Sequence, residues 1–352
     1  MRKTAFKRAE NEVQLCGEWS SIMRRMNAVF RIVVFIRREN ARPLRFFHAL
    51  SCGDFREKRI FARYKLTHYN RMKKTLIITV LGLIGMLLPT ALGSCGGNTD
   101  GKLTTDSIGL GRTSGADTCS LEIDFPTGGP RRLRDSVRVF IAQQLDSLYV
   151  TMGDTKPYEQ VWTEGVPKNG RVLAEKYVDI NLRELKRLRG DEFPEQLGLE
   201  QSLHLYKIDE TTDFVTYLSD AYSYTGGAHG SGYQAGTTFR KRDGKRLNMV
   251  VDTTKTAEMQ QLLREGIVRY FRDMGENELS EHDIISHLYI ENGVVPLPKS
   301  QPYMTKDGVV FLYGQYEIGP YVLGMPVFIA PYADVERFLT PEAADLVPQD
   351  QA

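Results

Sequence analysis

The sequence is poor in cysteine and in tryptophan. It holds four cysteines and two tryptophans in 352 residues, and only Cys95 and Cys119 lie beyond residue 94. Cys119 follows a stretch rich in glycine, serine and threonine. Small secreted domains that depend on disulfides carry many more cysteines in fewer residues. We therefore expect no disulfide framework, even if this protein is exported.

Signatures of common catalytic sites are also missing. Residues 95–352 contain no G-x-S-x-G elbow, no H-E-x-x-H helix, no P-loop, and no G-x-G-x-x-G after a strand. His282 and His287 lie among acidic residues, but a spacing of five places them about 140° apart on a helix. They would not face one metal ion. The sequence thus predicts no metal site and no cofactor, and it favours a protein without enzymatic activity.

The chain has little net charge, +2, because two unlike parts cancel. Residues 1–71 hold 17 Lys and Arg against 6 Asp and Glu, whereas residues 95–352 hold 27 against 38. An acidic surface disfavours nucleic acid, since phosphates repel it. It attracts cationic partners and speeds their encounter. We therefore expect no nucleic-acid partner.

An export signal is the strongest local pattern. Met72-Lys73-Lys74 precedes an uncharged apolar run, Leu76 to Leu88, and then Leu92-Gly93-Ser94-Cys95. The run has the length of a signal-peptide core, and the tetrapeptide resembles a bacterial lipobox, whose cysteine is diacylated. We interpret residues 72–94 as a lipoprotein signal peptide and Cys95 as a lipid anchor in the cell envelope, at the outer membrane or the periplasmic face. The alternative is a transmembrane helix over 75–94, just long enough to span a bilayer.

The segments on either side of this signal show no sustained apolar period. We interpret residues 1–71 as translated upstream sequence outside the fold, with Met72 as the start of the protein. Residues 95–118 are rich in glycine, serine, threonine and aspartate. Because they offer few large apolar side chains to a core, they predict a flexible tether.

Apolar periodicity beyond residue 118 predicts an α+β fold, with helices packed on antiparallel sheet. The predicted helices cover residues 132–149, 172–188, 256–274 and 334–339. The predicted strands include 121–125, a pair formed by 203–208 and 214–224, and two strands at 309–313 and 327–329. A hairpin over 236–248 is expected to turn at Asp243-Gly244, the favoured two-residue pair. Five basic residues crowd its tip, which we interpret as a solvated turn: Arg240, Lys241, Arg242, Lys245 and Arg246.

The candidate site is centred on the segment 222–230. Tyr222 and Tyr224 alternate with small polar residues, as in a strand, and Gly226-Gly227 then allow a sharp turn. His229 follows between Ala228 and Gly230, with little bulk to shield it. A structural role for a lone histidine is more common than a catalytic one. We nevertheless take these residues as candidate binding residues: Tyr222, Tyr224, Gly226, Gly227, His229 and, from a later turn, Glu317.

The pattern Tyr-x-Tyr-Thr-Gly-Gly-Ala-His-Gly at 222–230, followed by 239–247, resembles the extracellular domain of RsiV-type anti-sigma factors. It also resembles the non-catalytic part of PdaC-type peptidoglycan deacetylases. A second block agrees, with Tyr316-Glu-Ile-Gly-Pro-Tyr321 between two strands and Pro331-Tyr332 after the second. The resemblance covers roughly residues 120–340. It implies two subdomains, 119–235 and 236–342, followed by a tail, 343–352.

The resemblance also implies a function. RsiV-type ectodomains bind lysozyme, a cationic protein, and the acidic balance of residues 95–352 agrees with such a ligand. We therefore expect a lipid-anchored, non-enzymatic envelope module that binds a cationic protein or cell-wall glycan (peptidoglycan). One alternative is a membrane-spanning anti-sigma factor with residues 1–71 in the cytoplasm. Another is a hydrolase of cell-wall glycan or a deacetylase-related enzyme, in which Glu317 would need a second acid about 5–10 Å away.

Overall fold

The structure is a computed structural model. It describes residues 101–349, apart from 151–155, 158, 163, 191, 192 and 195. These residues belong to one compact unit of the chain. The predictions for residues 1–71, for the signal peptide 72–94 and for the lipid anchor at Cys95 lie outside the described residues.

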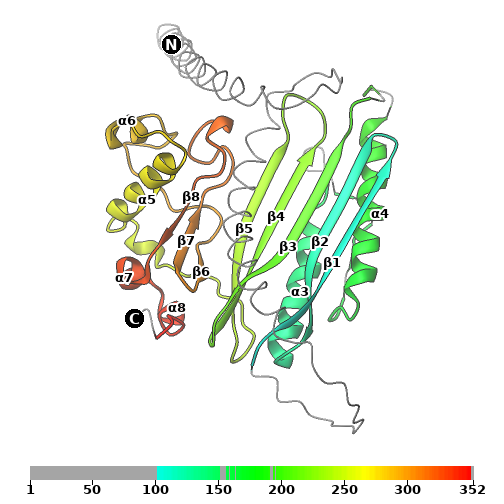
Figure 1. The fold of residues 1–352 in the computed structure, drawn as a ribbon, viewed down its shortest axis with the longest axis horizontal. Coiled ribbons are helices and arrows are strands. Elements are labelled where there is room, and N and C mark those ends of the chain that lie inside the picture. Colours follow the sequence, from blue (N-terminus) through cyan, green and yellow to red (C-terminus); the bar gives the residue numbers. More distant parts are fainter. Residues whose placement is uncertain are drawn as a thin grey trace, which may run out of the picture. The chain divides into compact units, whose positions relative to one another are not determined.

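A five-stranded sheet with the order β1-β2-β3-β4-β5 forms the centre of the fold (Figure 1). Neighbouring strands are antiparallel except for β2 and β3, which run parallel. A parallel pair needs a long crossover connection, and here two helices supply it. The strands are β1 Thr104–Ser114, β2 Asp117–Gly128, β3 Glu200–Glu210, β4 Phe214–Tyr224 and β5 Ser231–Arg240.

The crossover helices α3, Arg131–Ser147, and α4, Gly170–Arg189, pack on one face of this sheet. Leu133, Val137 and Ile141 of α3 are fully buried, at the spacing that the sequence predicted. The side chain of Asn169 caps α4 by accepting hydrogen bonds from two backbone N–H groups. The helix ends before Gly190, whose φ is +46°. Both predicted helices are therefore confirmed within two residues.

The opposite face of the five-stranded sheet contacts a second, three-stranded antiparallel sheet. Its strands are β6 Tyr303–Thr305, β7 Gly308–Leu312 and β8 Val327–Ala330. Tyr303, Val310 and Leu312 pack with Ile208 and Leu218 of the large sheet. Buried hydrogen bonds join the sheets as well, because the Thr216 hydroxyl donates to the Met304 carbonyl at 2.7 Å. Helix α5, Gln260–Asp273, packs on β8.

The α+β prediction is therefore confirmed, and a second hydrophobic core surrounds α5 and the smaller sheet. The remaining short elements are η1 Thr253–Lys255, α6 Glu281–Ser286, η2 Tyr321–Leu323, α7 Tyr332–Val335, η3 Glu336–Phe338 and α8 Pro341–Ala344. Within the described ranges, no helix is long and apolar enough to cross a membrane. Cys119, the single cysteine there, is buried and unpaired.

The predicted tether is wrong over residues 104–118. This stretch forms β1 and the start of β2. The backbone of β1 is held by its ladder to β2, which needs no large side chains. Ile108 and Leu110 are partly buried against the core. β1 has eleven residues, and Ile108 and Leu110 are its two large apolar residues. Two apolar residues in a segment of this length do not form a pattern from which an edge strand can be predicted.

The boundary expected at 235/236 is also wrong, because it falls inside β5. The sequence predicts that a hairpin starts at Gly236, but the strand continues to Arg240. The hairpin itself exists, closed by a bridge between Phe239 and Arg246. Its loop is longer than the predicted two-residue turn, since the Arg240 N–H donates to the Lys245 carbonyl.

Candidate functional site: a junction of two aromatic loops

The first loop, residues 225–230, leaves the end of β4 and is called the His229 loop below. Gly226 and Gly227 have φ values of +98° and +92°, a region that side chains with a β-carbon rarely adopt. The Tyr224 hydroxyl donates to the Gly227 carbonyl at 3.0 Å and closes the turn. A β-carbon on Gly230 would lie 2.3 Å from the Tyr222 hydroxyl oxygen. Gly226 and Gly227 are thus required by their backbone angles, and Gly230 is required by its close packing against Tyr222.

The second loop, residues 313–326, joins β7 to β8 and is called the Tyr316 loop. The Tyr313 N–H donates to the Pro326 carbonyl at 2.8 Å, which closes the base of the loop. Both carboxylate oxygens of Glu317 are used inside the structure. One accepts from the Gly314 N–H and the other from the Lys299 N–H, each at 2.6 Å. The interpretation of Glu317 as a turn-capping acid therefore agrees with its geometry.

The two loops meet through their aromatic side chains. The His229 ring stacks on Tyr321 with the ring centroids 3.7 Å apart and the planes 23° apart. The Tyr316 hydroxyl lies 2.9 Å from Nε2 of His229, and Nδ1 lies 3.0 Å from the Gly230 carbonyl. A carbonyl only accepts, so we assign the proton to Nδ1 and let Tyr316 donate to Nε2. We call His229, Tyr316 and Tyr321 the aromatic junction.

The junction is open to solvent, although its geometry is well defined. His229 is exposed and Tyr316 is 53% exposed. Tyr316 also has a φ of +63°, one of two positive values at described non-glycine residues. Such a conformation costs free energy in a bulky residue and is found often at functional sites. The Gln315 side chain adds a further link by accepting from the Gly232 N–H at 3.0 Å.

The chemistry available at the junction is that of a binding surface. Tyrosine faces bind cations and stack on flat apolar groups, and the Tyr316 hydroxyl can exchange hydrogen bonds with a ligand. Glu317 is occupied by backbone groups, so it is poorly placed as a proton donor. Burial, and then the charge of Glu317, raise the pKa of the Tyr313 hydroxyl, which donates to the Pro296 carbonyl. No cluster of three metal-ligating side chains occurs in the part of the chain that the structure describes.

The residues predicted from sequence take different parts in this site. His229 lies in the junction, whereas Tyr222 and Tyr224 are half-buried and support the loop beneath it. Gly226 and Gly227 allow the positive φ angles of the first loop, and Glu317 accepts two backbone hydrogen bonds that hold the second loop. Sequence reasoning missed Tyr316 and Tyr321 as binding residues. Their motif was visible, but nothing in the sequence showed that it would lie against His229, 87 residues earlier.

Residues 251–333 match the family model described as "Protein of unknown function (DUF3298)". These residues form a DUF3298 domain. The domain contains the Tyr316 loop, while the His229 loop precedes it in the chain. The aromatic junction is therefore built from the DUF3298 domain and from the strand region before it. No curated protein matches the sequence.

Two solved structures are similar to the chain. One is a DUF3298 family member from Bacteroides fragilis, 17% identical, with a TM-score of 0.51 over 68% of this chain and 96% of that one. The other is a DUF3298 family protein from Pseudomonas aeruginosa PAO1, 16% identical, with a TM-score of 0.47 over 71% and 98%. At 17% identity, the similarity to the Bacteroides fragilis structure is evidence for a shared fold and for nothing further.

Proposed function

We propose that the protein is a non-enzymatic binding module of the cell envelope, anchored by a lipid on Cys95, whose ligand binds at the aromatic junction. The ligand class that we favour is a cationic protein such as lysozyme, with cell-wall glycan as the second class. The resemblance to RsiV-type ectodomains supports this proposal, and so does the acidic balance of residues 95–352.

The observation that carries the proposal is the convergence of His229, Tyr316 and Tyr321. A folded protein normally buries its large rings, but here a tyrosine with a strained backbone remains half-exposed beside an exposed histidine. Aromatic residues that are held rigidly at a surface are typical anchors of recognition sites. The Arg and Lys side chains of a cationic protein would bind over the tyrosine faces.

Two other functions remain as alternatives. In an anti-sigma factor, residues 1–71 would lie in the cytoplasm, and their basic excess would agree with that orientation. In a glycan hydrolase, Glu317 would act with a second acid. Because both Glu317 oxygens already accept backbone hydrogen bonds, the binding module is favoured over the hydrolase.

Calorimetric titration with hen lysozyme and, separately, with a chitin oligosaccharide tests the binding role. We expect Tyr316→Ala to weaken binding about tenfold or more, as at other exposed aromatic anchors. Tyr289→Ala is the matched control, since Tyr289 is 65% exposed and its ring lies outside the aromatic junction. Added salt should weaken lysozyme binding but not glycan binding. Unchanged binding of both ligands by Tyr316→Ala would contradict the proposal.

The lipid anchor needs an experiment of its own. Cys95→Ala should release the protein from the membrane fraction or stall its processing, and mass spectrometry of the native protein should show a diacylated Cys95 at the N-terminus. Expression from Met72 should give the same product. Unchanged anchoring of Cys95→Ala would favour a transmembrane helix, and native peptides from residues 1–71 would favour the anti-sigma alternative.

A further inference from the structure

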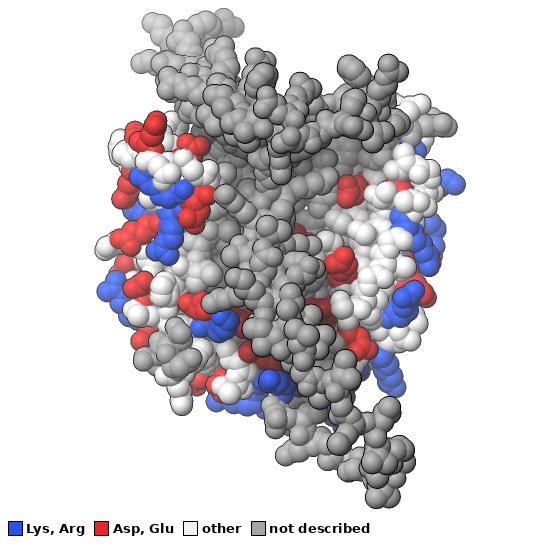
Figure 2. Space-filling model, viewed as in Figure 1, with Lys and Arg blue, Asp and Glu red and all other residues white. Residues whose placement is uncertain are grey.

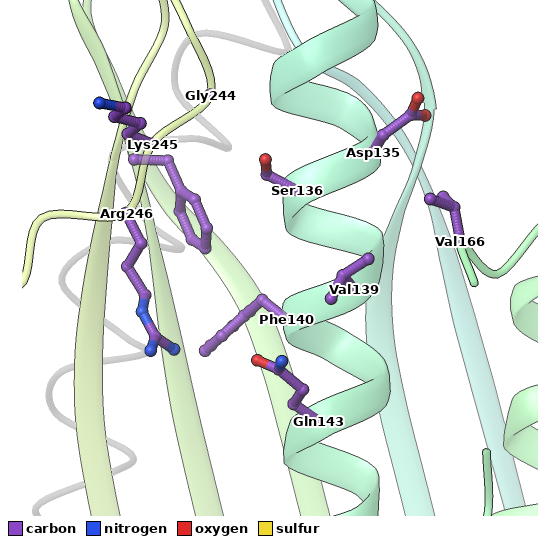
Figure 3. A pocket seen from close by; sticks show the side chains of 10 residues that line it. Asp135, Ser136, Val139, Phe140, Gln143, Val166, Gly244, Lys245 and Arg246 are labelled. Carbon is purple, nitrogen blue, oxygen red and sulfur yellow. The ribbon is translucent and has the colours of Figure 1, made fainter. Parts of the chain in front are cut away.

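A trough of about 360 Å³ crosses helix α3, far in sequence from the Tyr316 loop (Figure 3). The hairpin after β5 forms one wall, and Val166 lies on the other side of the helix. Its volume falls in the range of pockets that hold small organic ligands. The hairpin is held close to α3, because a β-carbon on Gly244 would lie 2.6 Å from the backbone of Arg132.

One side of the trough is apolar. Phe140 and Phe239 lie at its floor with ring centroids 5.4 Å apart and planes at 71°. Both rings are almost completely buried, so only their edges reach the trough. Val139 and Val166 add aliphatic surface, and Val166 is 40% exposed. These side chains would cover the apolar body of a ligand.

The other side carries hydrogen-bond donors without a recorded partner. Ser136 and Gln143 point from α3 toward the hairpin, and the Arg246 guanidinium extends toward the level of Gln143, away from Ser136 (Figure 3). Within the part of the chain that the structure describes, these three side chains form no ion pair and no hydrogen bond. An arginine and an amide that lie at the same level of the trough suit a carboxylate or phosphate group.

The charges around the trough single out Arg246 among the basic residues of the hairpin. Arg240 forms a bidentate pair with Asp243, Lys241 pairs with Glu210, and Arg242 lies 3.7 Å from Asp345. The Lys245 ammonium points away from α3 (Figure 3). The prediction that these five basic residues form a solvated turn therefore holds only in part. Three of them have carboxylate partners, and Arg246 faces the trough.

Asp135 is the carboxylate that lines the trough, and it would oppose an anion. Its side chain points away from the hairpin (Figure 3) and lies 3.2 Å from Arg134 and 3.6 Å from Arg131. Its charge is thus compensated at the end opposite Arg246. We propose that the trough binds a small organic anion, with its carboxylate or phosphate on Arg246 and Gln143 and its apolar body over Val139 and the two phenylalanine edges.

The experiment uses two pairs of probes that differ in the anionic group. N-acetylmuramic acid and octanoate carry a carboxylate on a sugar and on an acyl chain, whereas N-acetylglucosamine and octanol lack it. Titration of the full-length protein, followed by calorimetry and by NMR shift mapping, should show saturable binding of one of the two anions with shifts in α3 and the hairpin. The anion that binds identifies a sugar acid or a fatty acid as the source.

Substitutions then test the geometry. Arg246→Gln should weaken anion binding about tenfold or more, because it removes a charge-assisted hydrogen bond. Arg242→Gln is the matched control on the same hairpin, because Arg242 does not line the trough, and it should bind within about twofold of the parent protein. No saturable binding of either anion, equal binding of the uncharged analogues, or full binding by a folded Arg246→Gln protein would each overturn the proposal.

Discussion

The Tyr316 hydroxyl hydrogen-bonds to Nε2 of His229 across 2.9 Å and so connects two loops that lie 87 residues apart in the chain. One loop joins β4 to β5 of the five-stranded sheet, and the other lies in the segment that matches the DUF3298 model. The Gly232 N–H and the Gln315 side chain join the same two segments a second time. A ligand at the aromatic junction would therefore contact a loop of the five-stranded sheet and a loop of the three-stranded sheet at the same time.

The acidic balance of residues 95–352 is the electrostatic setting of the junction, although Lys and Arg lie among Asp and Glu on the face shown in Figure 2. Red carboxylate groups appear at several places between the two flanks of the visible face. Register places Glu122 beside His204, and His204 beside Asp220, across three neighbouring strands. This row adds negative charge to the sheet that carries the His229 loop, which would assist the encounter with a cationic protein.

Backbone strain at Tyr316 leads to a prediction that separates stability from binding. Tyr316→Asn should keep the free energy of unfolding within about 1 kcal/mol of the parent, because asparagine tolerates a positive φ better than most residues. It should nevertheless weaken lysozyme binding, since the exposed ring is lost. Tyr316→Val should lower stability by about 1–2 kcal/mol, because a β-branched residue is strained at this φ. Urea denaturation with parallel titration measures both effects.

The two glycines of the His229 loop should differ in their response. Gly227 has open space around it, so Gly227→Ala should cost only the strain of a positive φ, about 1–2 kcal/mol. Gly226→Ala should cost more, because its β-carbon would also lie 2.5 Å from the Phe193 ring. Gly227→Val should likewise lower the melting temperature. Equal losses for the two alanine variants would mean that Phe193 moves aside without cost.

Close approach between the sheets makes Gly236 sensitive to any side chain. A β-carbon there would lie 2.1 Å from the Tyr303 ring, and overpacking of this kind costs about 1–3 kcal/mol. Gly109→Ala is the matched control in a strand, because it has no atom within 4 Å of the added carbon. Thermal unfolding should show a clear loss for Gly236→Ala and little change for Gly109→Ala. A stable Gly236→Ala protein would argue against this contact between the sheets.

Asp117 should contribute to acid sensitivity. Burial alone would raise the pKa of its carboxyl, but hydrogen bonds from Arg189 and from the Leu199 N–H outweigh burial, and the pKa is lowered. A lowered pKa in the folded state stabilises the protein above the unfolded value, about 3.9, and this stability is lost as pH falls below about 4. Asp117→Asn should unfold with a weaker pH dependence between about pH 4 and 2.

Urea denaturation at several pH values compares the two proteins. Arg189→Gln offers a second check, because removal of the guanidinium leaves burial as the main influence on the Asp117 carboxyl. The stability of that variant should begin to fall at a higher pH than that of the parent. Identical pH profiles for all three proteins would show that this ion pair has no part in acid unfolding.

Much of the fold could be predicted from local pattern alone. Apolar residues at helical spacing located α3 and α4, and alternation located β4, β7 and β8. Gly226-Gly227 marked the turn after β4, because the angles they adopt are closed to other residues. Each of these signals depends on near neighbours in the chain, so the amino-acid sequence by itself determined them. The composition of residues 95–352 likewise determined the acidic balance.

Only the tertiary structure decided the features that depend on distant partners. Strand β1 contains few apolar residues, and it is a strand because β2 pairs with its backbone. The parallel pair of β2 and β3 follows from the helical crossover between them. The aromatic junction exists because contact between the two sheets brings Tyr316 and Tyr321 to His229. Such contacts carry no local periodicity, since the residues that make them are separated by most of a domain in sequence.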